Sequence, residues 1–303
     1  MVDTSLSKLT DADLLLLLTI RRLEEELLSL FSQGRLNGTT HTCLGQEYIP
    51  VALQHLMTAD DFLFTAHRGH GHYVAQFGDV TGLLAEIMGR EGGVCNGVGG
   101  SQHLYRDRRY LSTGIQGESL PVAAGVAHHF KRKNSTAIVV AVIGDGTWGE
   151  GAVYEALNMT AVWCLPLIVL VENNGISQTT PTRLQMAGDI KRRAAAFDID
   201  YVVESSKDVN AIRARLAPHF EKTRECRTPL IVEIITDRLG PHSKGDDSRD
   251  PRELERIRAQ DWYALYQQAY SDQCDRLNVE AKSRIAAALE TVEAANPAIW
   301  GTA

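Results

Sequence analysis

The sequence predicts an α/β fold, a doubly wound and mostly parallel sheet with helices on both faces. Apolar runs rich in β-branched residues have the length and composition of strands that are buried on both faces. Helical patterns separate these runs, and strand alternating with helix builds βαβ units with right-handed crossovers. The expected strands are 62–65, 137–143, 167–171, 201–203 and 230–235, and the expected helices between them are 119–133, 150–163, 192–197 and 209–224.

The N-terminal part is expected to form an amphipathic helix over 11–31. Its apolar run, 14–20, follows the acidic Asp11 and Asp13 and precedes the basic Arg21. A signal peptide needs a basic start, and a membrane span needs about 20 apolar residues. The run meets neither condition, so we expect this helix to pack on a core or on a partner.

Loops rich in glycine or in polar residues divide the rest of the chain. They are 89–100, 114–117 and 240–250. Glycine lets the backbone approach a ligand closely. Asp250 followed by Pro251 predicts the start of a helix, because aspartate caps helices and proline suits their first position. We therefore expect an N-terminal helical segment (1–40), an α/β binding domain (41–245) and a C-terminal helical extension (246–303).

Composition excludes several classes of protein. With 303 residues, 44% of them hydrophobic, the chain has enough material for a large buried core. A net charge of −7 leaves no positive field for nucleic acid. The five cysteines are scattered and form no C-x-x-C pair, which argues against a disulfide framework or a zinc knuckle and favours a reducing cytoplasm.

Two polar turns follow neighbouring predicted strands. Asp145, in Gly144-Asp145-Gly146, ends one strand, and Asn174 lies at the end of the next strand along the chain. The carboxyl ends of parallel strands meet at one edge of the sheet, beside helix N-termini that attract anions. We therefore expect Asp145 and Asn174 to lie close together.

An Asp carboxylate and an Asn amide oxygen are hard ligands that suit Mg²⁺, whereas zinc prefers His or Cys. Each turn alone is ordinary loop chemistry. Glycine-rich fingerprints of dinucleotide-binding and P-loop proteins are absent from the sequence. Together the two turns resemble the signature of thiamine-diphosphate enzymes, Gly-Asp-Gly followed by Asn-Asn.

The resemblance covers about residues 10–250. It is to the α subunit of the first, decarboxylating component of 2-oxo acid and acetoin dehydrogenase complexes. The motifs that carry it, in the family's order, are Cys43-Leu44-Gly45-Gln46-Glu47, His67-Arg68-Gly69-His70-Gly71, Gly99-Gly100-Ser101-Gln102-His103, Gly114-Ile115-Gln116-Gly117, the segment 144–180 and the loop at His242-Ser243.

This resemblance implies roles for single residues. The implied Mg²⁺ ligands are Asp145, Asn174 and the backbone carbonyl of Ile176. The implied contacts to thiamine diphosphate are His67, Arg68, Gly114, Gln116, Asp145, Gly146, Thr147, Asn174, Ile176, Arg238 and His242. His242 matches the family's active-site histidine, and His41 and His70 are further catalytic candidates. The remaining histidines that we interpret as structural are His55, His128, His129 and His219.

Three positions depart from the family pattern. His67 replaces a tyrosine that usually precedes the arginine, which alters one diphosphate contact. Thr147-Trp148-Gly149 replaces small residues and an asparagine, and Trp148 either reshapes the pocket or packs under the sheet. Glu118, after Gln116-Gly117, puts an unexpected charge near the pyrimidine edge.

Three functions follow from the resemblance. The first is cleavage of a 2-oxo acid or acetoin-like donor, with acyl transfer to a lipoyl or other carrier thiol. The second, suggested by Gly149-Glu150-Gly151, is split transketolase-like transfer of a two-carbon ketol or glycolyl unit from a sugar phosphate to a carrier protein, such as an acyl carrier protein. Lys244 and Arg183 are the candidate phosphate contacts. The third is a non-catalytic Mg²⁺–diphosphate-binding subunit.

A second subunit is implied in each enzymatic case. In the family, the glutamate that activates the cofactor comes from a β subunit, and the chain has no room for a second sheet domain to supply it. We expect an α₂β₂ assembly, with no nucleic acid and no membrane as partner.

Overall fold

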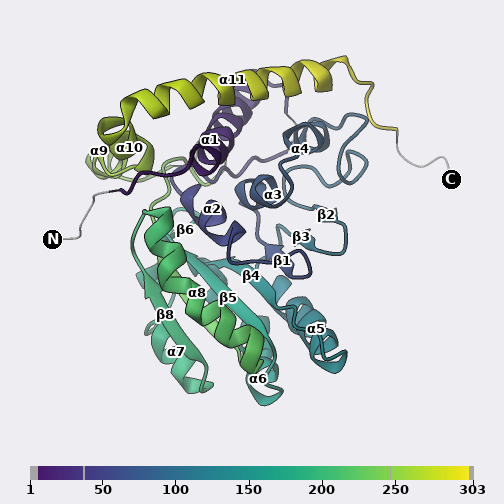
Figure 1. The fold of residues 1–303 in the computed structure, drawn as a ribbon, viewed down its shortest axis with the longest axis vertical. Helices are drawn as coiled ribbons and strands as arrows, with labels where there is room; N and C mark the ends of the chain where they lie inside the picture. Colours follow the sequence, from purple (N-terminus) through teal and green to yellow (C-terminus); the bar gives the residue numbers. More distant parts are fainter. Residues whose placement is uncertain (1–5, 37, 244, 246, 300–303) are drawn as a thin grey trace.

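The computed structural model describes residues 6–36, 38–243, 245 and 247–299. Its centre is a mixed sheet of seven strands (Figure 1). In spatial order the strands are β2 (Tyr105–Arg106), β3 (Tyr110–Ser112), β1 (Phe62–Thr65), β4 (Val139–Gly144), β5 (Leu167–Asn173), β9 (Leu230–Ile235) and β8 (Asp200–Glu204).

All neighbouring strands except β2 and β3 run parallel. The longest pairings are those of β5, which lies between β4 and β9 and hydrogen-bonds to both. Gly144 at the end of β4 is in register with Glu172, so the turns after β4 and β5 begin side by side. The doubly wound, mostly parallel α/β fold predicted from the sequence is confirmed.

Alternate residues of the central strands enter two separate cores. Val140 and Val142 of β4 belong to one apolar cluster, and Val139 and Ala141 belong to the other. This two-sided burial is the reason why the strands read as continuous apolar runs. The helices that line the second core are α5 (Ser119–Arg132), α6 (Gly151–Val162) and α7 (Ile190–Ala196). The first core contains α2 (Tyr48–Gln54), α3 (His70–Phe77), α4 (Val80–Ile87) and α8 (Val209–Cys226).

Helices from the two ends of the chain complete the first core. α1 (Asp11–Ser32) packs against α11 (Ser271–Ala294), which lies across one end of the molecule (Figure 1). The Asp250 side chain accepts a hydrogen bond from Arg252 N and caps α9 (Pro251–Ala259), as the sequence predicts. α10 (Trp262–Ala269) leads into α11. The helical segments at both ends therefore share one apolar cluster with the sheet.

Short elements between the long ones were not predicted. They are α2, α3, α4, β2, β3, the hairpin β6 (Ile176–Ser177) and β7 (Thr180–Pro181), and the 3₁₀ turns η1 (Asp145–Gly149) and η2 (Thr182–Leu184). Each spans at most eight residues, too few for a periodic pattern to stand out. η1 matters most for function, because it holds Asp145 at the end of β4 before α6 begins.

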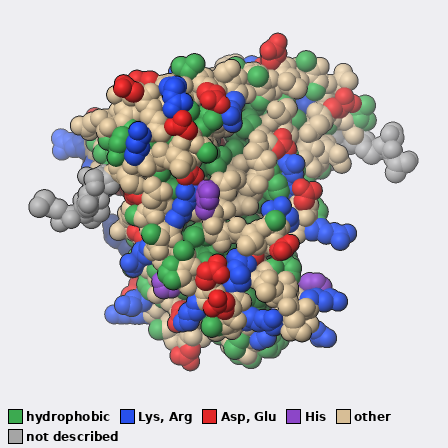
Figure 2. Space-filling view, viewed as in Figure 1, with side chains coloured by type: hydrophobic (Ala, Val, Ile, Leu, Met, Phe, Trp, Pro, Cys, Tyr) green, Lys and Arg blue, Asp and Glu red, His purple; other side chains and the backbone are tan. Residues whose placement is uncertain are grey.

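Charges of both signs are mixed over the surface. Figure 2 shows acidic and basic side chains side by side on the face in view. Among the helices of the described ranges, none has the length and apolar character that crossing a membrane requires.

Candidate functional site

Five parallel strands end at the same edge of the sheet and surround one cavity. Its volume is about 500 Å³. The segments that line it follow β1, β3, β4, β5 and β9. This is the place where open α/β sheets bind ligands. The predicted site residues that line it are His41, His67, Arg68, Gly114, Gln116, Asp145, Gly146, Asn174, Ile176, Arg238 and His242.

The turns after β4 and β5 form one side of the cavity, which we call the strand-end wall (Gly144–Thr147 and Glu172–Ile176). Thr147, a predicted cofactor contact, is 1% exposed and lies behind the residues that line the cavity. Asp145 is 2% exposed, and its carboxylate accepts hydrogen bonds from the Thr182 hydroxyl and from the backbone of Asn174. Burial nevertheless raises the pKa of the Asp145 carboxyl above its usual range. A buried carboxylate of this kind is stabilised by a cation. The predicted pairing of Asp145 with Asn174 is thus present in the structure.

Tight turns fix the rest of this wall. The Asn174 amide oxygen accepts a hydrogen bond from Ile176 N at 3.2 Å, which closes an Asx turn. Gly146 lies against the Ser177 side chain, and a Cβ at Gly146 would come within 2.3 Å of the Ser177 hydroxyl. Only glycine therefore allows the hairpin β6–β7 to approach η1 so closely.

The chemistry of this wall fits a hard cation. Asp145, Asn174 and the Ile176 carbonyl offer oxygen atoms only, which matches the preference of Mg²⁺. In the described ranges of the chain, no three His, Cys, Asp or Glu side chains cluster in a way that would hold a metal ion. A metal here would need further oxygen ligands from a bound anion or from water.

Two buried arginines reach the same cavity. Arg68 and Arg238 are 7% and 2% exposed. Arg68 donates to the Thr42 carbonyl at 2.7 Å and to the His242 carbonyl at 3.2 Å. Burial and the positive charge of Arg238 lower the pKa of Arg68 to about 10. Two like charges buried together are stabilised by an anion, and the planar guanidinium suits phosphate oxygens.

Three histidines form the other side, which we call the histidine wall (His41, His67 and His242). The ring of His41 lies 4.7 Å from that of His67 and 4.7 Å from that of His242, measured between centroids. Arg68 Nη2 lies 3.2 Å from His242 Nδ1. The three rings come from loops that are far apart in the sequence.

A chain of side-chain hydrogen bonds joins this wall to the strand-end wall. The Gln116 amide nitrogen lies 2.9 Å from His67 Nδ1, and the Thr147 hydroxyl donates to the Gln116 amide oxygen at 2.7 Å. Burial, followed by the positive charge of Arg68, holds the pKa of His67 well below its usual range. All three members belong to segments where the sequence departs from the family pattern.

His70 lies outside the cavity, unlike the other catalytic candidates. It is fully buried, with Nδ1 3.2 Å from a Glu24 carboxylate oxygen and Nε2 2.9 Å from the Ser101 carbonyl. Burial favours the neutral ring, but the Glu24 carboxylate outweighs it and the pKa of His70 is raised. Both ring nitrogens are engaged by the protein. None of the histidines that we interpreted as structural lines the cavity either.

The other departures lie outside the histidine wall. Trp148 is 1% exposed and packs in the second core, so it lies under the sheet and not in the pocket. Glu118 is exposed, and its carboxylate accepts a hydrogen bond from the Thr113 hydroxyl at 2.8 Å. Arg183 lines a neighbouring cavity of about 1120 Å³, whereas Lys244 falls outside the described residues.

Several cavity residues were not predicted. They are Gln102, Glu150, Glu172, Ser177, Gln178 and Gln185. Glu172 is bonded to the buried His72 ring at 2.9 Å. Gln102 belongs to a motif that carries the resemblance, and Glu172 directly precedes Asn173-Asn174, so position gave a signal for these two. No sequence pattern marks Gln178, which lies in the turn of the hairpin β6–β7, or Gln185, which follows η2.

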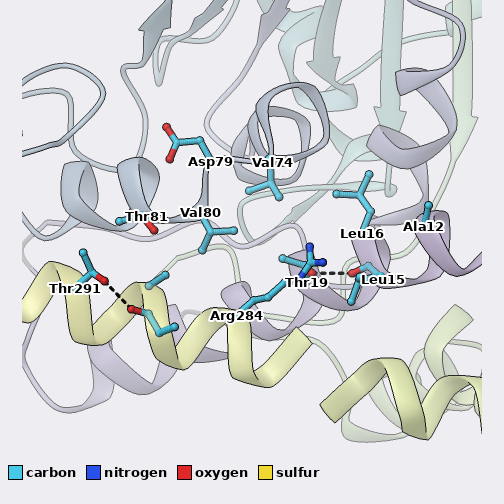
Figure 3. Close-up of a pocket in the computed structure, with 13 residues that line it drawn as sticks. Ala12, Leu15, Leu16, Thr19, Val74, Asp79, Val80, Thr81, Arg284 and Thr291 are labelled. Carbon is cyan, nitrogen blue, oxygen red and sulfur yellow. Dashed lines mark hydrogen bonds between the residues drawn. The ribbon is translucent and has the colours of Figure 1, made fainter. Parts of the chain in front are cut away.

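A further cavity, of about 580 Å³, lies between α1, α4 and α11 (Figure 3). Its walls are mainly apolar, with Leu15, Leu16 and Val80 turned toward it. The hydroxyls at its edge, those of Thr19 and Thr291, donate to carbonyls of their own helices. Asp79 and Arg284 also line this cavity, but they belong to different walls and each forms its ion pair with another residue, so we place the candidate site at the sheet edge.

Comparison with known proteins agrees with this geometry. Residues 16–297 match the model of the family described as dehydrogenase E1 component. The chain is 33% identical to the pyruvate dehydrogenase E1 component subunit alpha of Rhizobium meliloti, an alignment that covers 80% of this chain and 72% of that protein.

Two acetoin:2,6-dichlorophenolindophenol oxidoreductase subunits alpha are also similar. The protein of Bacillus subtilis is 35% identical, over 80% of this chain and 73% of its own length. The protein of Cupriavidus necator is 32% identical, over 91% of this chain and 87% of its own length. This chain therefore belongs to the dehydrogenase E1 component family.

Proposed function

We propose that this chain is the α subunit of a thiamine-diphosphate-dependent enzyme that, with a β subunit, cleaves a 2-oxo acid or acetoin-like donor. The two-carbon acyl unit would pass to a lipoyl or other carrier thiol. One observation carries the proposal: in a chain of the E1 family, a cation-seeking carboxylate (Asp145) and two anion-seeking arginines (Arg68 and Arg238) border the same cavity.

The strand-end wall would hold Mg²⁺ and the diphosphate. Asp145, Asn174 and the Ile176 carbonyl would provide the oxygen ligands of the metal, and the backbone N–H groups of Gly146 and Thr147 would be available to the phosphates. Arg68 and Arg238, which line the same cavity, would neutralise phosphate charge. Bound thiamine diphosphate supplies the carbon nucleophile and the electron sink for cleavage of the donor, and the protein supplies position and electrostatics.

The histidine wall would bind the donor and handle protons. The ring of His242 packs edge-on against the ring of His41, and Arg68 lies within hydrogen-bond distance of His242. Neutral imidazoles accept and donate protons near pH 7. We assign His70 to a supporting role, since its bond to the Ser101 carbonyl holds the loop that carries Gln102.

The partner would cover the open side of the cavity. Gly114 and Gln116 line the cavity, and Ile115 between them is 61% exposed. Val122, on α5 nearby in sequence, is 47% exposed. Apolar side chains beside a polar cavity suit an interface. A β subunit placed there would bring the activating glutamate, in an α₂β₂ assembly.

Calorimetry and dye reduction test this proposal. The chain is mixed with the β subunit, titrated with thiamine diphosphate and Mg²⁺, and assayed for 2,6-dichlorophenolindophenol reduction with pyruvate or acetoin. Asp145→Ala should abolish binding and turnover, while Asp200→Ala, which removes an exposed carboxylate paired with Lys222, should change neither. Turnover of order 1–10³ s⁻¹ by the chain alone would contradict the two-subunit proposal.

The polarity of the cavity favours a second candidate, ketol transfer from a sugar phosphate. Amide side chains of Gln102, Gln116 and Gln178 line it, and such groups suit hydroxylated donors. Release of a shortened aldose phosphate from a ketose phosphate, with no reaction on pyruvate or acetoin, would favour this candidate. Tight cofactor binding without turnover of either donor class would indicate a non-catalytic subunit.

A further inference from the structure

We propose that Gln116 and Thr147 are positioning residues that hold His67 as a neutral imidazole with its proton on Nε2, so that the ring donates one hydrogen bond to an anionic ligand oxygen in the cavity. The proposal rests on the proposed function only for the identity of that ligand. The shared chemistry is a phosphate or carboxylate oxygen.

The orientation of the Gln116 amide is the first step. Its nitrogen lies 2.9 Å from His67 Nδ1 and 3.5 Å from the Gly114 carbonyl, and its oxygen accepts from the Thr147 hydroxyl at 2.7 Å. With the amide reversed, its oxygen would face the Gly114 carbonyl oxygen, and two acceptors would repel each other. The amide nitrogen is therefore the atom that faces His67.

The tautomer of His67 follows from this orientation. A ring nitrogen that accepts a hydrogen bond carries no proton, so the proton of the neutral ring lies on Nε2. Among the described residues, no side chain or backbone group hydrogen-bonds to His67 Nε2, and the ring lines the cavity. The donor is thus available to a ligand.

The surrounding charges explain why a neutral donor is useful. Arg68 and Arg238 already place two positive charges at the cavity, and His41 and His242 pack against the His67 ring. A third full positive charge in this buried cluster would be repelled by the first two. A neutral imidazole adds a directed hydrogen bond without adding charge.

Nitrogen-15 solid-state NMR of the full chain, labelled in its histidine rings, tests the tautomer. The His67 signals are identified by their loss in His67→Phe. In the wild type at pH 7, Nε2 should be protonated and Nδ1 unprotonated. Gln116→Glu should move the proton to Nδ1 or charge the ring, because a carboxylate only accepts. A doubly protonated or Nδ1-protonated His67 in the wild type would overturn the proposal.

Thr147 offers a matched pair of variants. Thr147→Val removes the hydroxyl that holds the Gln116 amide against His67 and should give a mixture of His67 tautomers, whereas Thr147→Ser keeps the hydroxyl and should preserve the wild-type spectrum. Identical spectra for the two variants would contradict the role of Thr147. These spectra need no cofactor, so they remain decisive even if the proposed function fails.

The two ligand sources are separated by binding and kinetics with the β subunit present. Loss of the hydrogen bond in His67→Phe should weaken the binding of one of the two ligands about tenfold or more, as expected for a bond to a charged oxygen. Weaker binding of thiamine diphosphate in calorimetry assigns the bond to the diphosphate. A higher KM for the donor with unchanged cofactor affinity assigns it to the donor carboxylate. If neither value changes, the donor role of His67 is wrong.

Discussion

The two walls of the cavity are built in different ways. The strand-end wall comes from one βαβ unit, in which β4 and β5 pair in register and place Asp145 beside Asn174. The histidine wall comes from three loops that are far apart in the sequence, and side-chain hydrogen bonds hold them together. One wall is therefore a consequence of strand pairing, and the other depends on distant packing.

The two walls also differ in how closely they follow the family pattern. Asp145 and Asn174 in the strand-end wall keep the motif of the family. Three residues from segments that depart from it, His67, Gln116 and Thr147, form a chain of hydrogen bonds that joins the two walls. We infer that this chain retains its cofactor site through the backbone and adapts its chemistry through side chains. Variants that affect one wall and spare the other test this inference.

The largest effect is expected from Arg21, which supports the histidine wall from a distance. Arg21 is buried, bonds both oxygens of Asp261 at 2.7 and 2.9 Å, and pairs with Glu47. Glu47 in turn accepts a hydrogen bond from Gly45 N, in the loop that follows His41. Arg21→Met leaves two buried carboxylates without their cation and should lower the free energy of unfolding by about 3–5 kcal/mol.

Urea unfolding followed by circular dichroism measures this loss. Arg284→Met is the control, because Arg284 forms an exposed pair with Glu280 on α11 and such pairs contribute little. Because Arg21 supports the histidine wall and not the strand-end wall, Arg21→Met should also change the KM for the donor more than the affinity for Mg²⁺. Equal stability of Arg21→Met and the wild type would show that the buried network does not hold the histidine loops.

The next effect concerns Arg68, which is bonded to the histidine wall and lines the same cavity as the strand-end wall. Its guanidinium bonds the Thr42 and His242 carbonyls and lines the cavity in which we propose that the diphosphate binds. Arg68→Met should weaken thiamine-diphosphate binding about 10–100-fold, since hydrogen bonds between charged groups contribute about 1.5–3 kcal/mol. Titration calorimetry with the β subunit measures the affinity.

Arg183→Met is the matched control for that measurement. Arg183 is exposed and does not line the candidate cavity, although the neighbouring cavity of about 1120 Å³ that it lines shares Asn174, Ile176 and Arg238 with it. The affinity of the Arg183→Met variant for thiamine diphosphate should equal that of the wild type. Equal weakening by Arg68→Met and Arg183→Met would mean that the charge of the whole region, and not a direct contact, attracts the diphosphate.

The same contrast explains what the sequence could predict. The long strands and helices were predicted because period and composition identify them, and Asp145 and Asn174 were paired because parallel strands end at one edge. The family resemblance, not periodicity, pointed to His41, His67 and His242. Their contact depends on loops whose path no local pattern describes.

The sequence also could not predict which buried side chains contact each other. His70 was a catalytic candidate because its motif resembles that of the family, yet Glu24 from α1 engages its ring. Gln178 reaches the cavity only because the hairpin β6–β7 folds back over η1. Such contacts join segments that are far apart in the sequence, so they become visible only in three dimensions.

A smaller, pH-dependent effect is expected from the Glu24–His70 pair. The pKa of His70 is raised in the folded chain by the Glu24 carboxylate, although burial opposes it. The stability that this pair contributes is fully present below the unfolded pKa of histidine, near 6.5, and is lost as the pH rises through the raised folded value. Glu24→Gln should therefore destabilise the chain more at pH 6 than at pH 9, by about 1–3 kcal/mol at pH 6.

Thermal unfolding at the two pH values measures the difference. Glu25→Gln, which changes the neighbouring and more exposed carboxylate, should show no such pH dependence. If the destabilisation caused by Glu24→Gln were the same at pH 6 and pH 9, the pair would not titrate in this range. His70 would then require another explanation for its place behind the 99–103 loop.

The smallest effect is expected from Glu118, an exposed departure from the family pattern that does not line the cavity. Its carboxylate is exposed and bonds the Thr113 hydroxyl, while Gln116, two residues earlier, turns into the cavity. Solvent screens a charge in this position. Glu118→Gln should change the KM for the donor and the cofactor affinity less than about threefold, because a shift below about 0.7 kcal/mol corresponds to that factor.

Gln116→Leu, measured beside Glu118→Gln, should raise the KM for the donor more. A larger effect from Glu118→Gln than from Gln116→Leu would extend the adapted region beyond the histidine wall, to the side where the β subunit is expected to dock.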